Sequence, residues 1–161
     1  MVEYISPDEV VELILANPKR DDYLIIDVRS SDFAGGNLPG AVNLTTREFG
    51  TDSRLAATIS THIAPRTPPL QLVIVHCMRS QTRGPYAAHL LATSPDLPHG
   101  VQVRVLKGGF QGWWKRFQGR SELFENLPPG FDAEWRERVL APEGSRSEAA
   151  DSKKLREQQQ A

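Results

Sequence analysis

The chain has 161 residues, of which 39% are hydrophobic and 24% charged, and its formal net charge is −1. These values predict a soluble globular domain and exclude an overall field that would draw the protein to nucleic acid or to a membrane surface. A single cysteine excludes an internal disulfide. No signal peptide and no apolar run of about 18 residues is recognised, so we expect a cytoplasmic or nuclear protein whose thiol stays reduced.

The first third of the chain alternates helix and strand patterns. Ser6, Pro7 and Glu9 form a helix-start pattern, in which the serine is the N-cap and the proline occupies the first helical position. Residues 23–29 form a short apolar run that is typical of a buried strand. A loop rich in glycine follows and ends in a brief predicted strand over residues 41–44.

The same alternation continues through the rest of the domain. The later predicted elements are a helix after Thr51 or Asp52, a strand over 70–76, a helix over 84–94, a strand over 101–106 and a helix after Gly108-Gly109. Of the two rings Trp113 and Trp114, we expect one in the core and one partly exposed. Alternating strands and helices predict an α/β fold with a largely parallel central sheet and helices on both faces.

The composition changes near residue 140. Residues 141–161 contain one leucine, no aromatic residue and many charges, so they cannot bury enough apolar surface to order on their own. We therefore expect a domain over residues 1–140 and a charged tail over 141–161.

Cys77, the cysteine, ends the most apolar strand, at the edge of a parallel sheet where ligands usually bind. A lone cysteine in such a place is often a small buried hydrophobe. Here, however, it is followed by a polar loop and by the start of a helix at Gly84. The loop consists of Met78, Arg79, Ser80, Gln81, Thr82 and Arg83. Free loop amides and the positive helix end would form an anion site and would favour the thiolate over the thiol.

Arg83 completes this predicted oxyanion site. Its planar guanidinium can bind two oxygens of a tetrahedral anion at once, which leaves the central atom facing the Cys77 sulfur for attack. The four histidines show no metal-ligand spacing, so the predicted mechanism uses no metal and no cofactor. His76 adjoins the thiol and is a candidate for tuning it.

The stretch "HCMRSQTRGP" resembles the His-Cys-x5-Arg-Gly-Pro signature of the cell-cycle dual-specificity phosphatases that act on cyclin-dependent kinases. It is equally similar to the related fungal and protozoan arsenate reductases, and both groups belong to the rhodanese-like superfamily. Two further stretches, "LIIDVRSSDFAGGNLPGAVNL" and "VLKGGFQGWW", resemble motifs of that superfamily, so that the likeness covers roughly residues 5–120.

The resemblance implies a single rhodanese-like domain and a thiol-based enzyme. One reading is a phosphatase for phosphotyrosine- or phosphothreonine-type monoesters, acting on phosphorylated proteins through a cysteinyl-phosphate. The alternative is an arsenate reductase for a small oxyanion, in which glutathione or glutaredoxin acts as external reductant. A sulfurtransferase would carry a shorter Cys-x4-Arg loop, and a non-catalytic module that binds phosphorylated partners would need no nucleophile.

The residues that support the loop and the proton donor each have more than one candidate role or residue. The resemblance assigns Asp27 to hydrogen bonds that support the loop, whereas its residue type equally suits a structural partner for Arg29. The cell-cycle phosphatases have a glutamate immediately before the arginine of the loop, where this chain has Thr82. The proton donor to the leaving group is therefore open among the nearby carboxylates, which are Asp32, Glu48 and Asp52.

Overall fold

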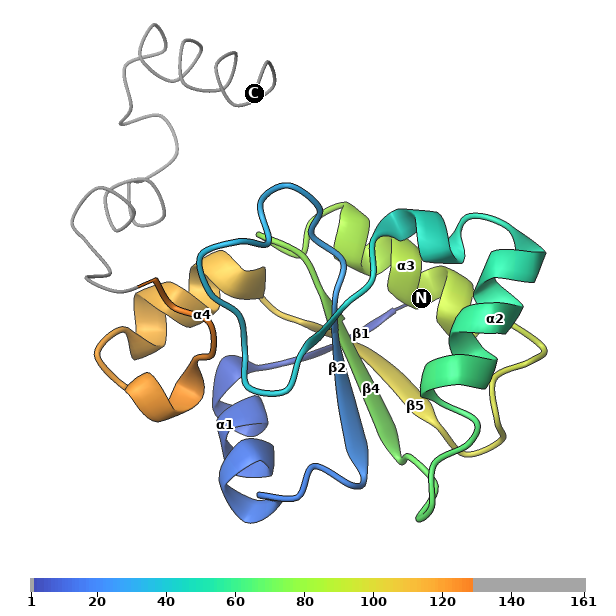
Figure 1. Ribbon diagram of the computed structural model, residues 1–161, viewed down its shortest axis with the longest axis horizontal. Helices are drawn as coiled ribbons and strands as arrows, with labels where there is room; N and C mark the ends of the chain where they lie inside the picture. Colours follow the sequence, from blue (N-terminus) through green and yellow to red (C-terminus); the bar gives the residue numbers. More distant parts are fainter. Residues whose placement is uncertain (1, 129–161) are drawn as a thin grey trace, which may run out of the picture. The chain divides into compact units, whose positions relative to one another are not determined.

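The computed structural model describes residues 2–128, which form a parallel sheet covered by helices (Figure 1). The strands are Glu3–Ile5 (β1), Tyr23–Asp27 (β2), Val42–Asn43 (β3), Leu72–His76 (β4) and Gln102–Leu106 (β5). The helices are Pro7–Ala16 (α1), Asp52–His62 (α2), Arg83–Ala92 (α3) and Gly109–Phe117 (α4), with 3-10 turns at Thr46–Phe49 (η1) and Ser121–Leu123 (η2).

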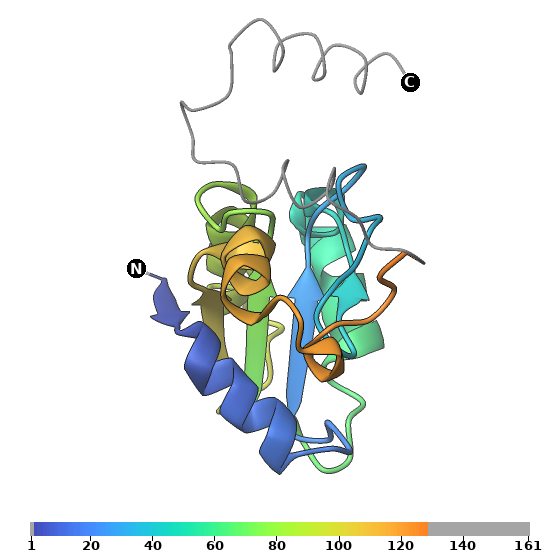
Figure 2. The same ribbon diagram turned by 90° about the vertical axis from the view of Figure 1, so that its left-hand side faces the viewer.

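The strand order in the sheet is β1-β5-β4-β2-β3, and every pairing among the described strands is parallel. Strand β4, whose sequence is LVIVH, lies at the centre and is buried from its second residue onward. Figure 2 shows α1 and α4 on one face of the sheet and α2 and α3 on the other. The predicted α/β fold with helices on both faces is thereby confirmed.

Two N-caps explain where the helices on either face begin. The Ser6 hydroxyl accepts a hydrogen bond from the backbone N–H of Glu9 at 3.2 Å, as the helix-start pattern predicts. Of the two alternatives for α2, Thr51 is the N-cap, and its hydroxyl accepts from the Arg54 N–H at 3.2 Å. Each cap satisfies one of the backbone donors that a helix start leaves without an intrahelical partner.

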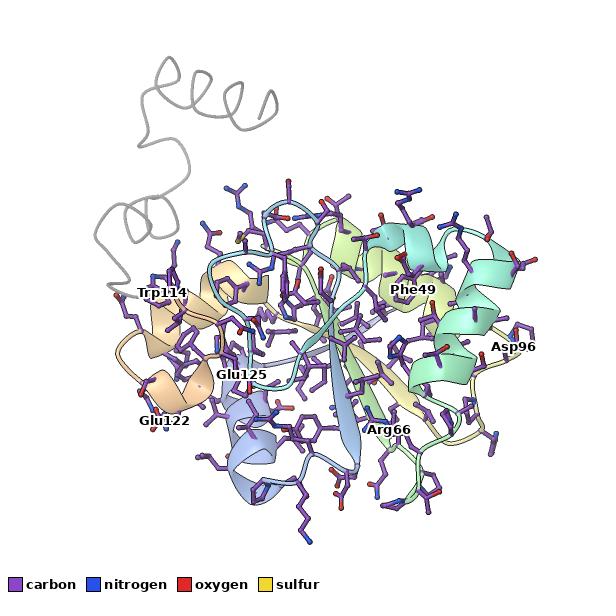
Figure 3. The ribbon with its side chains drawn as sticks, viewed as in Figure 1. Phe49, Arg66, Asp96, Trp114, Glu122 and Glu125 are labelled. Carbon is purple, nitrogen blue, oxygen red and sulfur yellow. The ribbon has the colours of Figure 1, made fainter. Side chains whose placement is uncertain are left out.

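Apolar side chains pack on both faces of the sheet (Figure 3). Phe49 belongs to the cluster beside α2 and α3, whereas Trp114 lies on α4 at the opposite face. The expectation that one tryptophan is partly exposed was wrong, since Trp113 and Trp114 are both buried. The segment after α4 covers them: Trp114 packs edge-on against Phe124, and the indole N–H of Trp113 donates to the Leu123 carbonyl at 2.9 Å.

The structure differs from the predicted elements at two strands, β1 and β2. Strand β1 was not predicted, because a three-residue strand at the edge of a sheet is too short to show a period. Strand β2 ends at Asp27 rather than at Arg29, since the Arg29 side chain folds back onto the Asp27 carboxylate. The predicted boundary at residue 140 and the tail over 141–161 lie outside the described residues. Within residues 2–128, no helix is both long and apolar enough to cross a membrane.

Candidate active site

Cys77 directly follows the last residue of β4, and the loop of residues 77–83 leads from it into α3. The thiol is 3% exposed, and its Sγ accepts a hydrogen bond from the backbone N–H of Ser80 at 3.2 Å. Ser80 has a φ of 56°, in the left-handed region that few residues other than glycine adopt. This strained residue turns a backbone donor toward the sulfur, so the loop curls over the thiol rather than running away from it.

The first two peptide groups of the loop are fixed from outside by the start of α4. The Cys77 carbonyl accepts from the Phe110 N–H at 3.0 Å, and the Met78 carbonyl accepts from the Gln111 N–H at 2.8 Å. Both peptides are trans, so the N–H group of each points opposite to its carbonyl. The amides of Met78 and Arg79 therefore point away from α4.

Two glycines allow this close packing around the loop. A Cβ atom on Gly109 would lie 2.6 Å from the carbonyl oxygens of both Cys77 and Met78, and the φ of Gly109 is 60°. A Cβ atom on Gly84 would lie 3.2 Å from the Cα of His76, which is tighter than most Cβ contacts, so the glycine lets α3 begin this close to β4. The glycine of the Gly-Gly motif and the glycine of the Arg-Gly-Pro motif thus pack against the cysteine loop from two sides.

Arg83 is the first residue of α3, and its guanidinium binds the carboxylate of Asp32 in a bidentate pair. Nη1 donates to Oδ1 at 3.0 Å and Nη2 donates to Oδ2 at 2.7 Å. Burial pushes the pKa of Asp32 up, but the hydrogen bonds and charge of Arg83 outweigh it and leave that pKa below its ordinary value. The pKa of Arg83 is raised, chiefly by the hydrogen bonds to Asp32 and further by the negative charges of Asp32, Cys77 and Asp27.

Beneath the loop lies a buried polar cluster of Asp27, Arg29 and His76. Asp27 and His76 are register partners at the ends of β2 and β4. The Asp27 carboxylate accepts from Arg29 at 2.7–3.0 Å through both Nε and Nη2, and all three side chains are fully buried. Arg29 also donates to the backbone carbonyls of Asp32 and Gly36, so it ties the loop after β2 to the sheet.

His76 connects this buried cluster to the candidate nucleophile. Its Nδ1 lies 2.9 Å from the Cys77 carbonyl oxygen and its Nε2 lies 3.6 Å from an Asp27 oxygen. Because a carbonyl accepts only, Nδ1 carries the proton. Burial lowers the pKa of His76, and this outweighs the opposing effect of the Asp27 charge. The neutral imidazole therefore helps to orient the Cys77 peptide.

The sequence-predicted residues have distinct places in this arrangement. Cys77 and Arg83 lie at the two ends of one loop, as the sequence predicts. Of the two roles considered for Asp27, its hydrogen bonds are those of a structural partner of Arg29. Glu48 accepts from the Thr45 hydroxyl at 3.5 Å and Asp52 begins α2, so both act locally.

Sequence reasoning missed two features of the site. Asp32 was a candidate acid, but its pairing with Arg83 was not predicted, because no spacing rule links two residues 51 positions apart. Sequence reasoning also did not connect Gly109 with the cysteine loop, although a Cβ atom there would lie 2.6 Å from two loop carbonyl oxygens, so this glycine is part of the support of the site. Among residues 2–128 no group of three or more His, Cys, Asp or Glu side chains is arranged to hold a metal ion.

Comparisons with known proteins agree with this architecture. The rhodanese-like domain family matches residues 6–116. A dual specificity phosphatase of Schizosaccharomyces pombe is 30% identical over 145 residues, covering 77% of this chain and 96% of its own length. The structure of a yeast protein tyrosine phosphatase of the rhodanese family superposes with a TM-score of 0.66, at 27% identity, over 81% of this chain and 97% of that one.

A second solved structure belongs to an enzyme with a different activity. The As-Sb reductase of Leishmania major has a TM-score of 0.63 and 25% identity, over 87% of this chain and 98% of that one. The family match, the parallel sheet and the cysteine loop at its carboxyl edge all lead to the same conclusion. This chain belongs to the rhodanese-like domain family.

Proposed function

We propose that this protein is a cysteine-dependent phosphatase that hydrolyses phosphomonoesters of the phosphotyrosine or phosphothreonine type through a cysteinyl-phosphate on Cys77. The observation that carries the proposal is the loop itself. The Cys77 Sγ accepts a hydrogen bond from a backbone N–H, and the two peptides that follow Cys77 turn their amides away from α4. Arg83 lies at the end of the loop. A phosphorylated protein or a small oxyanion is the substrate class that suits such a site.

In the proposed reaction, the loop amides and the Arg83 guanidinium bind the three non-bridging oxygens of the phosphate group. The Cys77 thiolate attacks phosphorus, and the bond from phosphorus to the leaving oxygen breaks. Water then attacks the cysteinyl-phosphate, which releases phosphate and restores the thiolate. His76 acts as a supporting residue, since its Nδ1–H donates to the Cys77 carbonyl, and Asp27 supports the site indirectly through its buried pair with Arg29.

The relatives support this assignment by their names and by their coverage. A dual specificity phosphatase and a tyrosine phosphatase of the rhodanese family both align over nearly their whole lengths. The five-residue spacing between Cys77 and Arg83 also makes a larger loop than the one typical of sulfurtransferases. We therefore place phosphate ester hydrolysis ahead of sulfur transfer. We also place this activity in the cytoplasm or nucleus, where thiols stay reduced.

Arsenate reduction is the second candidate function. Arsenate is a tetrahedral oxyanion similar to phosphate, and the Leishmania major reductase shares the fold over 98% of its length. Because the chain has one cysteine, an external thiol such as glutathione, with glutaredoxin, would have to reduce the Cys77 adduct. Arsenate reduction requires such a reductant, whereas phosphate ester hydrolysis requires only water.

One preparation tested in three assays separates the candidates. We expect hydrolysis of p-nitrophenyl phosphate, whose leaving group departs without a proton and so needs no general acid. The parallel assays are glutaredoxin-coupled arsenate reduction and thiosulfate-to-cyanide sulfur transfer. Cys77→Ser should abolish hydrolysis while preserving the thermal unfolding transition. Turnover that persists in this variant would remove the thiol from the mechanism, and arsenate reduction without ester hydrolysis would favour the second candidate.

A further inference from the structure

Nη1 and Nη2 of Arg83, which form one of the two edges with which a guanidinium can bind an oxyanion, are already occupied. Asp32 places both carboxylate oxygens on the guanidinium, at 3.0 Å and 2.7 Å, in the bidentate arrangement that phosphate or arsenate oxygens would use. A guanidinium presents one such pair of donors on this edge. An anion that binds this edge of Arg83 must therefore displace the Asp32 carboxylate first, and an anion at the Nε edge would be repelled by the charge of that carboxylate.

Asp32 is held in place independently of Arg83. Its backbone carbonyl accepts from Nη1 of the buried Arg29 at 3.0 Å, and its Oδ1 accepts from the Ser30 N–H at 3.1 Å. The side chain of Asp32 is 31% exposed and that of Arg83 is 35% exposed. The main chain at residue 32 is thus anchored, while the carboxylate has solvent on one side into which it can turn.

The balance of this exchange depends on the charge of the incoming anion. A monoanionic carboxylate would replace one bidentate pair by another of the same kind and would gain little. A tetrahedral dianion brings a second charge and further oxygens for the loop amides, which Asp32 does not reach by any hydrogen bond among the described contacts. The pair therefore favours dianions over monoanions.

We propose that Asp32 is an internal competitor for the anion site and thereby sets its specificity: it occupies Arg83 in the free protein and yields it to tetrahedral dianions, but not to monoanions. This inference rests on the oxyanion site of the proposed function, and it concerns which anions enter that site rather than what happens to them there. It makes Asp32 a specificity-determining residue, not a catalytic one.

Direct binding to the full-length chain tests the competition without turnover. Sulfate serves as the dianion and formate as the monoanion, and both keep their charge between pH 6 and 8. In Asp32→Asn and Asp32→Ala, calorimetry should give sulfate dissociation constants at least about tenfold lower than in the native protein. Formate should bind to Asp32→Ala, where it replaces the lost carboxylate on Arg83, and should bind about tenfold more weakly to the native protein.

The chain offers a matched control in Asp8→Asn. Asp8 also forms a bidentate pair, with Arg116 at 2.7 Å for both bonds, but between α1 and α4. Sulfate affinity should not change in this variant, and circular dichroism should show that all three variants fold.

The competing outcomes each decide the matter. Equal sulfate affinity in native protein and Asp32→Asn would show that the carboxylate does not compete, and would leave the proposed phosphatase intact. Weaker binding in Asp32→Asn would show that Asp32 orients Arg83 for the anion, which also overturns the competition. If neither anion binds any folded variant, the oxyanion site itself is wrong, and the proposed function falls with the inference.

Discussion

Phe110 donates its backbone N–H to the carbonyl oxygen of Cys77 at 3.0 Å, so the first turn of α4 holds the peptide that follows the candidate nucleophile. This bond uses one of the donors that a helix start leaves free, and it fixes the direction of the amide on the other side of the same peptide. The geometry of the loop therefore depends on a helix that contributes no side chain to the chemistry we propose.

Gly109→Ala should damage the site through this contact. The added Cβ would lie 2.6 Å from two loop carbonyl oxygens, and the φ of 60° disfavours any L-residue. We expect the loop to shift away from α4 and kcat/KM for p-nitrophenyl phosphate to fall about 100-fold, the size of losing one oxyanion donor. The affinity for sulfate should decrease as well, because the same amides bind the anion.

Gly112→Ala is the matched control, since it also lies in α4. A Cβ atom added to Gly112 would lie 3.8 Å from the Lys107 carbonyl oxygen, which is an ordinary van der Waals contact. Alanine in a helix interior stabilises by about 0.5–1 kcal/mol relative to glycine, so this variant should be active and at least as stable as the native chain. Similar losses in both variants would trace the effect to α4 stability rather than to the loop.

Arg83→Ala should lose at least ~2 kcal/mol of transition-state stabilisation for ester hydrolysis, measured as kcat/KM. Arg83→Lys keeps the charge but not the planar fork, so it should recover only part of this loss. Arg116→Ala removes a bidentate arginine that pairs with Asp8 away from the loop and should react at the native rate. A native rate in Arg83→Ala would mean that another group binds the anion.

Local sequence patterns were enough to predict most of the fold. The apolar run at residues 70–76 and the polar loop after it placed Cys77 at the carboxyl edge of a parallel sheet, and the structure has it there. The start of α1 at residues 6–9 was predicted, and the start of α2 was narrowed to Thr51 or Asp52, because a cap depends on residues a few positions apart. Strand β1 was missed because it is ordered by pairing with β5, not by its own pattern.

The contacts that define the candidate site were harder to predict, because they join distant parts of the chain. Asp32 and Arg83 are 51 residues apart, and only the folded sheet brings their loops together. The choice between two roles for Asp27 likewise needed coordinates, since the direction of the Arg29 side chain decides it. Motif spacing thus locates a nucleophile, whereas pairings among charged side chains depend on the tertiary fold.

Asp27→Asn should destabilise the protein by about 3–5 kcal/mol, because it leaves the buried Arg29 charge without its carboxylate. Urea unfolding followed by circular dichroism measures this free energy. Replacing both partners, in Asp27→Asn with Arg29→Met, should cost less than the sum of the single changes, since no unpaired charge remains. Asp8→Asn breaks an exposed pair and should not shift the midpoint; an equally small shift in Asp27→Asn would contradict the assigned role of the buried pair.

The stability of the protein should fall as the pH drops below the ordinary histidine pKa of about 6.5. Burial holds the pKa of His76 below that value, so the folded chain stays neutral at this position while the unfolded chain takes up a proton. The unfolded state then binds more protons, and the free energy of unfolding decreases with falling pH, by up to about 1.4 kcal/mol per pH unit. The lowered pKa of Asp32 acts in the same direction, but only as the pH approaches the ordinary carboxyl range near 4.

His76→Gln isolates the histidine contribution. Glutamine does not titrate, so urea midpoints measured between pH 7.5 and 5.5 should change less in this variant than in the native chain, although its stability at pH 7.5 should be lower. His89→Gln removes an exposed histidine of α3 and should keep the native slope. A slope in His76→Gln as steep as that of the native protein would mean that folding does not change the proton uptake of His76, which contradicts the effect of its burial. A steeper slope in the variant would mean that the imidazole is charged in the folded state and is paired with the Asp27 carboxylate 3.6 Å away.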